Sequence, residues 1–321
     1  MGADTSTQRA DGAAGVVGAD GKAVDAAGAL TQRSGGRPIA LVTGASRGIG
    51  RAVAKILGRD YHVLVGATSE EGAAAVVAEL PSAEPFVADV TDPDQLAAAV
   101  ARAGLGGADE GTTGGAPDGV VEGATGGAPD GAVDSAGDGV VKGATGGAPN
   151  GADGGVVDGA TDGTGHPRLD VLVHSAGIWA KSDIADADRD EWARLLDVNV
   201  ISVVDLTRRM LPALREAGGT VVAINSGSGY HSGPGLGLYS ASKFALRAVT
   251  DALREEERGV VRVSSVHPGR VDTDMQVQIM GEDGYDGSKY VHVDSIAAAV
   301  RLCVEATDDC IVEEVTVRPR K

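Results

Sequence analysis

Short apolar runs alternate with amphipathic segments along most of the chain. The runs are rich in valine and isoleucine and carry no polar alternation, a pattern typical of strands that are buried on both faces of a parallel sheet. They lie at residues 39–42, 62–65, 85–88, 171–173, 221–224, 260–266 and 315–317.

The segments between these runs have helical patterns. Apolar residues from Ile49 to Leu57 form one stripe at helical spacing. Asp92 and Pro93 supply an N-cap and a first-turn proline for the next helix. Further helices are predicted over 191–214, where Pro212 should end the helix early, 239–257 and 294–306. This alternation predicts one α/β domain built on a doubly wound parallel (Rossmann) sheet.

Two segments interrupt this pattern. Residues 1–36 are predicted to be a disordered leader. Residues 104–166 hold 22 glycines, no aromatic residue and ten acids against Lys142 alone, a composition that predicts a flexible insertion. The unit Thr-Gly-Gly-Ala-Pro-Asp/Asn-Gly recurs there at unequal spacing, unlike the fixed period of a solenoid. The domain is therefore expected over 37–321, with the insertion hanging from the sheet edge opposite the active site.

Charge and cysteine content narrow the range of functions. The 28 Lys and Arg against 46 Asp and Glu give a net charge of -18, which disfavours nucleic-acid and membrane partners. No stretch approaches the length of a membrane span, and the start lacks a secretory pattern, so a cytoplasmic location is expected. Cys303 and Cys310 have no neighbouring ligands, which predicts reduced thiols and no metal site.

The first candidate motif follows the first strand, where Thr43 leads into Gly44-Ala45-Ser46-Arg47-Gly48-Ile49-Gly50 and then a helix. Glycines at such a turn let a pyrophosphate approach the unpaired N–H groups of the helix N-terminus. The spacing differs from GxGxxG, and a glycine turn without a ligand remains an alternative. No GxxxxGK[ST] motif occurs, which disfavours a nucleoside-triphosphate loop.

The second candidate motif is Tyr239 followed by Lys243, one helical turn later. A nearby ammonium can lower the pKa of a phenol and make it a useful acid or base, although many such pairs are surface contacts. Ser226, at the end of a predicted strand, and Asn199, inside a predicted helix, precede this pair.

Taken together, these residues resemble the short-chain dehydrogenase/reductase family, in its branch with a TGxxxGIG turn and a YxxxK pair. The resemblance covers the predicted domain without the leader and the insertion. It implies hydride transfer between nicotinamide and a small or medium carbonyl or secondary alcohol. It also implies a catalytic set of Asn199, Ser226, Tyr239 and Lys243. Tyr239 would be the general acid or base, Ser226 would bind the substrate oxygen, Lys243 would lower the phenol pKa and hold the ribose, and Asn199 would position a water.

The resemblance also implies the cofactor contacts. Ser175 belongs to His174-Ser175-Ala176-Gly177, which stands where the family usually has two asparagines before Ala-Gly. The implied contacts are Thr43, Gly44, Ser46, Arg47, Gly48, Ile49, Gly50, Thr68, Asp89, Val90, Ser175, Ala176, Gly177, Tyr239, Lys243, Pro268, Gly269 and Thr273.

The residues after the second strand bear on the choice of cofactor. An Asp there would bind a ribose 2′-hydroxyl and repel a 2′-phosphate, but the chain has Gly66-Ala67-Thr68-Ser69. Arg47 could pair with the phosphate, so NADP(H) is favoured and NAD(H) is the alternative.

Substrate and partners are less constrained by the sequence. A lid is expected over 276–290, and the absence of a cationic cluster favours an uncharged substrate. Members of the family commonly pair through two long helices, which implies a homodimer or homotetramer. The alternatives are a non-catalytic nucleotide-sensing or interaction protein on the same scaffold, and an epimerase or dehydratase, which would need a longer C-terminal domain.

Overall fold

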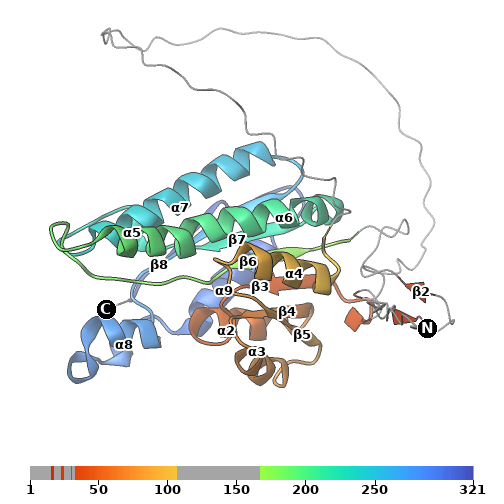
Figure 1. The fold of residues 1–321 in the computed structure, drawn as a ribbon, viewed down its shortest axis with the longest axis horizontal. Helices are drawn as coiled ribbons and strands as arrows, with labels where there is room; N and C mark the ends of the chain where they lie inside the picture. The colour runs from red at the N-terminus through yellow and green to blue at the C-terminus, as the bar shows by residue number, and fades with distance from the viewer. Residues whose placement is uncertain (1–15, 18–22, 25–29, 31–32, 107–166, 321) are drawn as a thin grey trace, which may run out of the picture. The chain divides into compact units, whose positions relative to one another are not determined.

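The computed structural model describes residues 16–17, 23–24, 30, 33–106 and 167–320. Within them, a seven-stranded sheet has the order β5-β4-β3-β6-β7-β8-β9, and all neighbouring strands are parallel. The strands are β3 (Ile39–Val42), β4 (His62–Ala67), β5 (Ala83–Val87), β6 (Val171–His174), β7 (Thr220–Ile224), β8 (Arg262–Pro268) and β9 (Glu314–Val317). The strand order reverses between β3 and β6, which confirms the doubly wound sheet (Figure 1).

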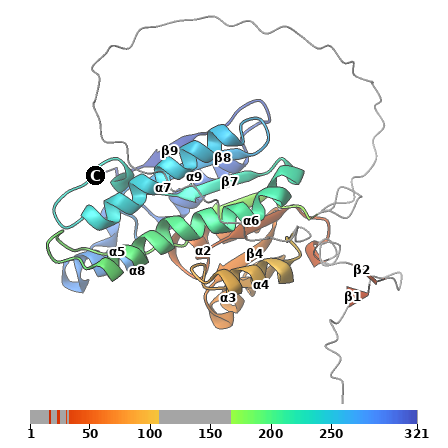
Figure 2. The ribbon, with the colours of Figure 1, turned by 45° about the horizontal axis from the view of Figure 1, so that its top comes forward.

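Helices cover both faces of this sheet (Figure 2). They are α2 (Gly48–Leu57), α3 (Glu70–Val77), α4 (Pro93–Ala103), α5 (Arg189–Leu196), α6 (Ser202–Ala217), α7 (Gly237–Glu256), α8 (Asp274–Met280) and α9 (Val293–Val304). A π turn, η1 (Asp197–Ile201), joins α5 to α6, and the short 3-10 turns η2 (Gly227–Gly229), η3 (Glu282–Gly284) and η4 (Gly287–Lys289) follow later strands and helices.

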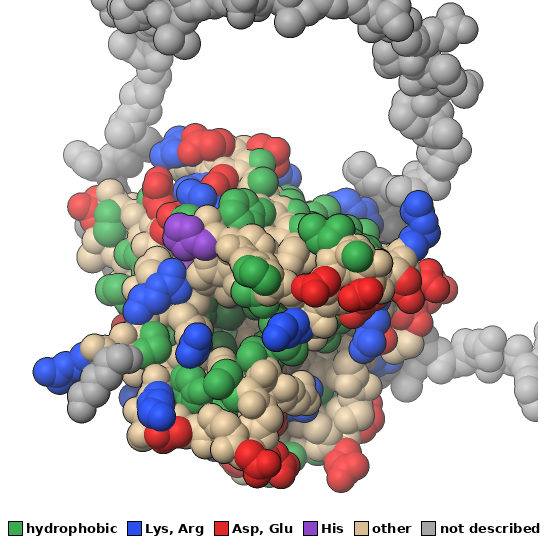
Figure 3. All heavy atoms as spheres, turned by 90° about the vertical axis from the view of Figure 1, so that its left-hand side faces the viewer, with side chains coloured by type: hydrophobic (Ala, Val, Ile, Leu, Met, Phe, Trp, Pro, Cys, Tyr) green, Lys and Arg blue, Asp and Glu red, His purple; other side chains and the backbone are tan. Residues whose placement is uncertain are grey.

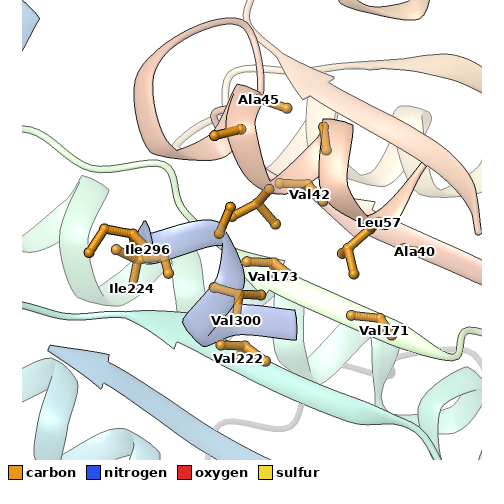
Figure 4. Packing of buried hydrophobic residues seen from close by; sticks show 14 of the residues in the cluster. Ala40, Val42, Ala45, Leu57, Val171, Val173, Val222, Ile224, Ile296 and Val300 are labelled. Carbon is orange, nitrogen blue, oxygen red and sulfur yellow. The ribbon is translucent and has the colours of Figure 1, made fainter. Parts of the chain in front are cut away.

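Alternate residues of each strand supply the two cores. Ala40 and Val42 of β3 join a cluster with α2 and α9, whereas Ile39 and Leu41 join a cluster with α4 and α6. Figure 4 shows the first cluster, where Val300 of α9 packs against strand residues such as Val173. This two-sided burial explains why the strand sequences are continuously apolar.

The predicted helix over 191–214 is wrong in two respects. The π turn divides it, and Pro212 lies inside α6, which continues to Ala217. Proline removes one backbone donor, but Pro212 is exposed, so water can satisfy the carbonyl that the donor would have bonded. The tertiary position of the proline therefore outweighs its helix-breaking tendency.

Part of the predicted leader contacts the domain. Leu30 is buried in the cluster with Ile39 and Leu41, and Arg33 forms a 2.6 Å ion pair with Glu84. Contacts with the domain therefore extend to Leu30 and Arg33, which precede the predicted start at residue 37. Two short strands, β1 (Val16–Val17) and β2 (Ala23–Val24), pair with each other in antiparallel fashion.

The predicted insertion lies almost wholly outside the described residues, which stop at residue 106 and resume at residue 167. Leu105 follows α4 and Leu169 precedes β6, and both side chains are buried in the domain. A helix-to-strand connection of this kind attaches at the amino ends of parallel strands, the edge opposite the candidate site.

Candidate active site

The predicted site residues gather at one edge of the sheet. They follow the carboxyl ends of six strands: Thr43 after β3, Thr68 after β4, Asp89 and Val90 after β5, Ser175 after β6, Ser226 after β7 and Gly269 after β8. Carboxyl ends of parallel strands meet at the same edge, where open α/β sheets bind ligands. Figure 3 looks onto this edge, where separate Lys and Arg side chains surround a hollow with hydrophobic side chains in it.

Backbone conformation and crowding explain the glycines of the turn. Gly44 and Gly48 have φ values of +62° and +54°, which disfavour residues with a side chain. A Cβ atom at Gly44 would lie 2.8 Å from the backbone of Ala176, and one at Gly50 would lie 2.2 Å from the carbonyl oxygen of Gly44. The turn therefore packs directly against the 175–177 loop.

Thr43 fastens these two segments together. Its buried Oγ1 accepts hydrogen bonds of 3.1 Å from the backbone N–H groups of both Ser175 and Ala176. Thr43 thus holds the end of β3 against the loop that follows β6, at the point where the strand order reverses.

The entrance to α2 suits an anionic group. Arg47 is exposed at the N-cap position, and the first turn of α2 carries no acid. Among the described residues, the Arg47 guanidinium has no hydrogen-bond or ion-pair partner. Free N–H groups, the helix dipole and a nearby cation together favour a phosphate.

Tyr239 and Lys243 face each other on α7. The Lys243 Nζ atom lies 5.9 Å from the centre of the Tyr239 ring and donates a 3.1 Å hydrogen bond to the carbonyl oxygen of Ile224. Burial lowers the pKa of Lys243 to about 8. Burial also raises the pKa of Tyr239, and a hydrogen bond with the Ser226 side chain offsets part of this rise. The net direction is opposite to the lowering expected from the ammonium, because desolvation is the larger effect.

Ser226 is held at the end of β7. Its backbone N–H donates to Asn225 Oδ1 at 2.8 Å, and its Oγ accepts from the Ser228 N–H at 3.1 Å. Behind it, His267 Nδ1 lies 3.2 Å from the Ser226 carbonyl oxygen. These contacts hold Ser226 in place, so the position of its hydroxyl, which hydrogen-bonds with Tyr239, is fixed by the surrounding backbone.

Asn199 lies in the π turn, with its side chain buried. Its Oδ1 accepts from the Ile178 N–H at 2.9 Å, and its Nδ2 donates to the Ile178 carbonyl at 3.0 Å and to Ser242 Oγ at 3.0 Å. A Cβ atom on Gly177 would lie 3.3 Å from Asn199 Oδ1 and 3.9 Å from Lys243 Nζ. The structure therefore brings Asn199, Lys243 and the 175–177 loop together, and π turns often mark such functional positions.

The segment after β8 approaches the glycine turn. A Cβ atom on Gly48 would lie 3.6 Å from the Thr273 methyl group, and Thr273 is the N-cap of α8. Gly48, Thr273 and Val277 line a hollow of about 480 Å³. The expected lid thus begins with a helix that sits beside the predicted cofactor turn.

Two histidines near the site, His174 and His267, form hydrogen bonds with neighbouring protein groups. His174 is buried, its Nε2 atom lies 2.9 Å from Thr207 Oγ1, and burial lowers its pKa to about 4. It occupies the family's usual asparagine position as a neutral side chain. His267 supports Ser226, as described above.

Two further polar residues, Asp89 and Arg318, lie at this edge of the sheet. Asp89 turns Oδ1 towards Thr91, accepting from its N–H at 3.0 Å and its hydroxyl at 2.7 Å. Arg318 was not predicted as a site residue, yet it follows β9 at the same edge and lies against Gly227. Its only signal in the sequence is a basic Arg318-Pro319-Arg320-Lys321 stretch in a chain of net charge -18.

The chain matches one known protein family over most of the described domain. Residues 38–109 and 156–283, more than half of the chain, match the family described as short chain dehydrogenase. The chain therefore belongs to the short-chain dehydrogenase family of oxidoreductases. The unmatched stretch between these ranges falls inside the predicted insertion.

Several curated proteins are similar to the chain over part of their length. An uncharacterized oxidoreductase of Staphylococcus saprophyticus is 34% identical over 154 residues, which cover 47% of this chain and 64% of that protein. Glycine betaine reductase of Emericella nidulans is 32% identical over 162 residues, covering 47% of this chain and 13% of that protein. The chain thus spans less than two thirds of either relative.

Solved structures match more of the chain. A short chain dehydrogenase from Burkholderia cenocepacia in complex with NADP is 26% identical, with a TM-score of 0.61 and coverage of 88% of this chain and 96% of that chain. An alcohol dehydrogenase from Thermococcus sibiricus complexed with 5-hydroxy-NADP is 23% identical, with a TM-score of 0.63 and coverage of 88% and 97%. The second likeness supports the fold alone.

Among the described residues, no helix is long and apolar enough to cross a membrane. No group of three potential His, Cys, Asp or Glu metal ligands occurs in this part of the chain. Both cysteines are free thiols, with Cys303 buried and Cys310 exposed.

Proposed function

We propose that the protein is an NADP(H)-dependent oxidoreductase that interconverts a small or medium carbonyl compound and its secondary alcohol. The observation that carries this proposal is the convergence of Ser226, Tyr239 and Lys243 at the sheet edge that holds the glycine turn. A hydroxyl that hydrogen-bonds with a phenol, and an ammonium near that phenol, are the groups that such proton transfer requires.

The residues around the glycine turn fit a dinucleotide. The positive-φ turn at Gly44 and Gly48 and the N-terminus of α2 would hold the pyrophosphate, and Thr43 fixes the facing loop. Exposed Arg47 and Thr68, with no acid directly after β4, would receive a ribose 2′-phosphate. When bound, the nicotinamide supplies or accepts the hydride.

The protein's own groups handle the proton. In carbonyl reduction, Ser226 would donate a hydrogen bond to the substrate oxygen, and the Tyr239 hydroxyl would donate the proton. The raised pKa keeps this phenol protonated at neutral pH, which suits an acid. Lys243 would place a positive charge beside the phenolate that remains, and Asn199 would hold the π turn and a water that reprotonates the site.

The direct test replaces Tyr239 with phenylalanine. Turnover of a ketone panel with NADPH should fall about a thousandfold, because the acid is lost, while the NADPH dissociation constant measured by fluorescence stays within a few-fold. Tyr61→Phe, which changes a partly buried tyrosine before β4 at the opposite edge, should behave as wild type. Retained activity in Tyr239→Phe would refute the proposal. NADPH binding by wild type without turnover of any ketone would favour the nucleotide-sensing alternative.

We also propose a homodimer or homotetramer formed through the long helices. Ile201, Val204 and Phe244 expose 57%, 45% and 44% of their surface on η1, α6 and α7. Large apolar side chains that are exposed on neighbouring helical elements favour association. Light scattering after size exclusion tests this, since Phe244→Glu should lower the measured mass. A cytoplasmic location remains a prediction from the sequence.

A further inference from the structure

Arg318 lies at the catalytic edge, on the side away from the glycine turn. It directly follows β9, and its side chain crosses the end of β8: a Cβ atom on Gly269 would lie 3.2 Å from Arg318 Cδ. The guanidinium reaches the end of β7, where a Cβ atom on Gly227 would lie 2.4 Å from Nη1. Gly227 directly follows Ser226, so the guanidinium lies against the residue next to the serine that would bind the substrate oxygen.

The contact depends on Gly227 having no side chain. Its backbone has no positive φ, so an L-residue could adopt this conformation without strain. A Cβ atom there would lie 2.4 Å from Nη1 and 3.0 Å from Nη2 of Arg318, so the guanidinium would have to move away. The absence of a side chain on Gly227 thus lets the Arg318 guanidinium lie directly against the backbone of Gly227.

The guanidinium is also unpaired. Within residues 33–106 and 167–320, no hydrogen bond or ion pair involves the Arg318 side chain. Nearby arginines on α7 are paired instead, Arg247 with Glu314 at 3.3 Å and Arg254 with Asp251 at 3.0 Å. In a chain with an excess of acids, an exposed arginine without a carboxylate is available to a ligand.

This arginine is too far along the sheet to serve the adenosine end of a dinucleotide. Arg47 follows β3, whereas Arg318 follows β9, and β6, β7 and β8 lie between these two strands. Four strand intervals separate the ends of β3 and β9 by about 19 Å. The Arg318 side chain therefore approaches the end of β7 from the β9 side, whereas Arg47 lies at the cofactor turn on the other side of β6.

We propose that Arg318 binds a carboxylate of the substrate, so that the enzyme acts on keto acids and hydroxy acids rather than on uncharged ketones and alcohols. The inference rests on the proposed function and revises its substrate class. A guanidinium donates two parallel hydrogen bonds to a carboxylate, which would orient the carbonyl of the same molecule towards Ser226 and Tyr239. Arg318 is thereby a specificity-determining residue that takes no part in proton transfer.

The test compares acids with their uncharged esters on the full chain with NADPH. The substrates are acetoacetate and levulinate, each beside its methyl ester, for wild type, Arg318→Ala and Arg318→Lys. Wild type should prefer at least one acid over its ester about tenfold in kcat/KM, since a charge-assisted pair contributes this much. Arg318→Ala should remove that preference through KM and leave the esters within about twofold. Arg318→Lys should be intermediate, because lysine keeps the charge without the paired donors.

Arg59→Ala is the matched control. The Arg59 side chain is exposed and makes no hydrogen bond or ion pair with the described residues, but it lies between α2 and β4, at the opposite edge of the sheet. Its removal should leave the preference for acids unchanged. Equal use of acid and ester by wild type, or an equal loss for both in Arg318→Ala, would overturn the proposal.

A binding measurement separates this proposal from the proposed function. Saturation-transfer NMR detects acetoacetate on the NADP⁺-saturated protein without turnover. A signal in wild type and in Arg59→Ala that is lost in Arg318→Ala supports the carboxylate site even if no ketone is reduced. An equal signal in wild type and Arg318→Ala, or none in wild type, overturns it even if uncharged ketones are reduced in a Tyr239-dependent manner.

Discussion

The Lys243 ammonium lies 5.9 Å from the centre of the Tyr239 ring, and its hydrogen bond to the Ile224 carbonyl ties α7 to the end of β7. The same strand end leads into Ser226. One buried cation thus links the helix that carries the phenol with the strand that delivers the hydroxyl. The electrostatics of this link lead to a prediction about pH.

Carbonyl reduction should weaken as pH rises through about 8. Burial lowers the pKa of Lys243 to about 8, so the ammonium is present below this pH and lost above it. Without the cation, the phenolate left after proton donation is no longer stabilised. The measurement is kcat for ketone reduction against pH in wild type and Lys243→Met. The variant should be much slower and lack the break near pH 8, and a flat wild-type profile from pH 7 to 9.5 would contradict this.

Removing Arg47 should change cofactor choice. Arg47→Ala is expected to raise the KM for NADPH about tenfold and leave the KM for NADH within about twofold, because only NADPH carries the 2′-phosphate. Steady-state kinetics with both cofactors measures this. Arg59→Ala again provides a control in which neither KM should move. Equal effects of Arg47→Ala on both cofactors would mean that the arginine does not contact this phosphate.

Loss of the Asn199 side chain should reduce both the stability of the protein and the rate of catalysis. Asn199→Ala leaves the Ile178 N–H and carbonyl without their buried partners, at a cost of about 1 to 3 kcal/mol in unfolding free energy. We expect kcat to fall about tenfold or more, since the π turn no longer holds its place beside Lys243. Denaturant unfolding and kinetics measure the two effects. An unchanged kcat in a destabilised variant would leave Asn199 a purely structural residue.

Acid should destabilise the protein through His174. The unfolded histidine takes up a proton near pH 6.5, whereas burial lowers the folded pKa to about 4, so protons favour the unfolded chain below pH 6.5. The shift corresponds to about 3 kcal/mol that is fully present above pH 6.5 and is lost as pH falls to about 4. His174→Asn, which cannot titrate, should lose less unfolding free energy between pH 7 and pH 5, as measured in urea.

The exposed histidine His231 supplies the comparison for this experiment. His231→Asn should lose as much stability as wild type over the same pH range. If His174→Asn and wild type lose equal amounts, other groups account for acid sensitivity.

Local sequence was sufficient for the fold and for the sheet edge at which the candidate site residues lie. Strands made of continuous Val and Ile runs have no polar face for solvent, so they suit burial on both faces of a sheet. Helices between successive strands then allow those strands to run parallel. Since parallel strands end at one edge, residues that follow them, such as Thr43, Ser226 and Gly269, had to meet there. The one-turn spacing of Tyr239 and Lys243 similarly fixed their common helix face.

Tertiary structure decided the features that depend on distant neighbours. Pro212 is tolerated in α6 because it lies on the exposed side of that helix. Leu30 joins the core although the residues around it in the sequence predict disorder. The pKa of Tyr239 rises because burial outweighs its polar contacts, a balance that no spacing reveals. Arg318 reaches Gly227 only because β9 pairs with β8 and β8 with β7, which brings residues that are remote in the chain to the same place. Sequence determines which groups an element carries, whereas packing determines which of them lose water and which of them meet.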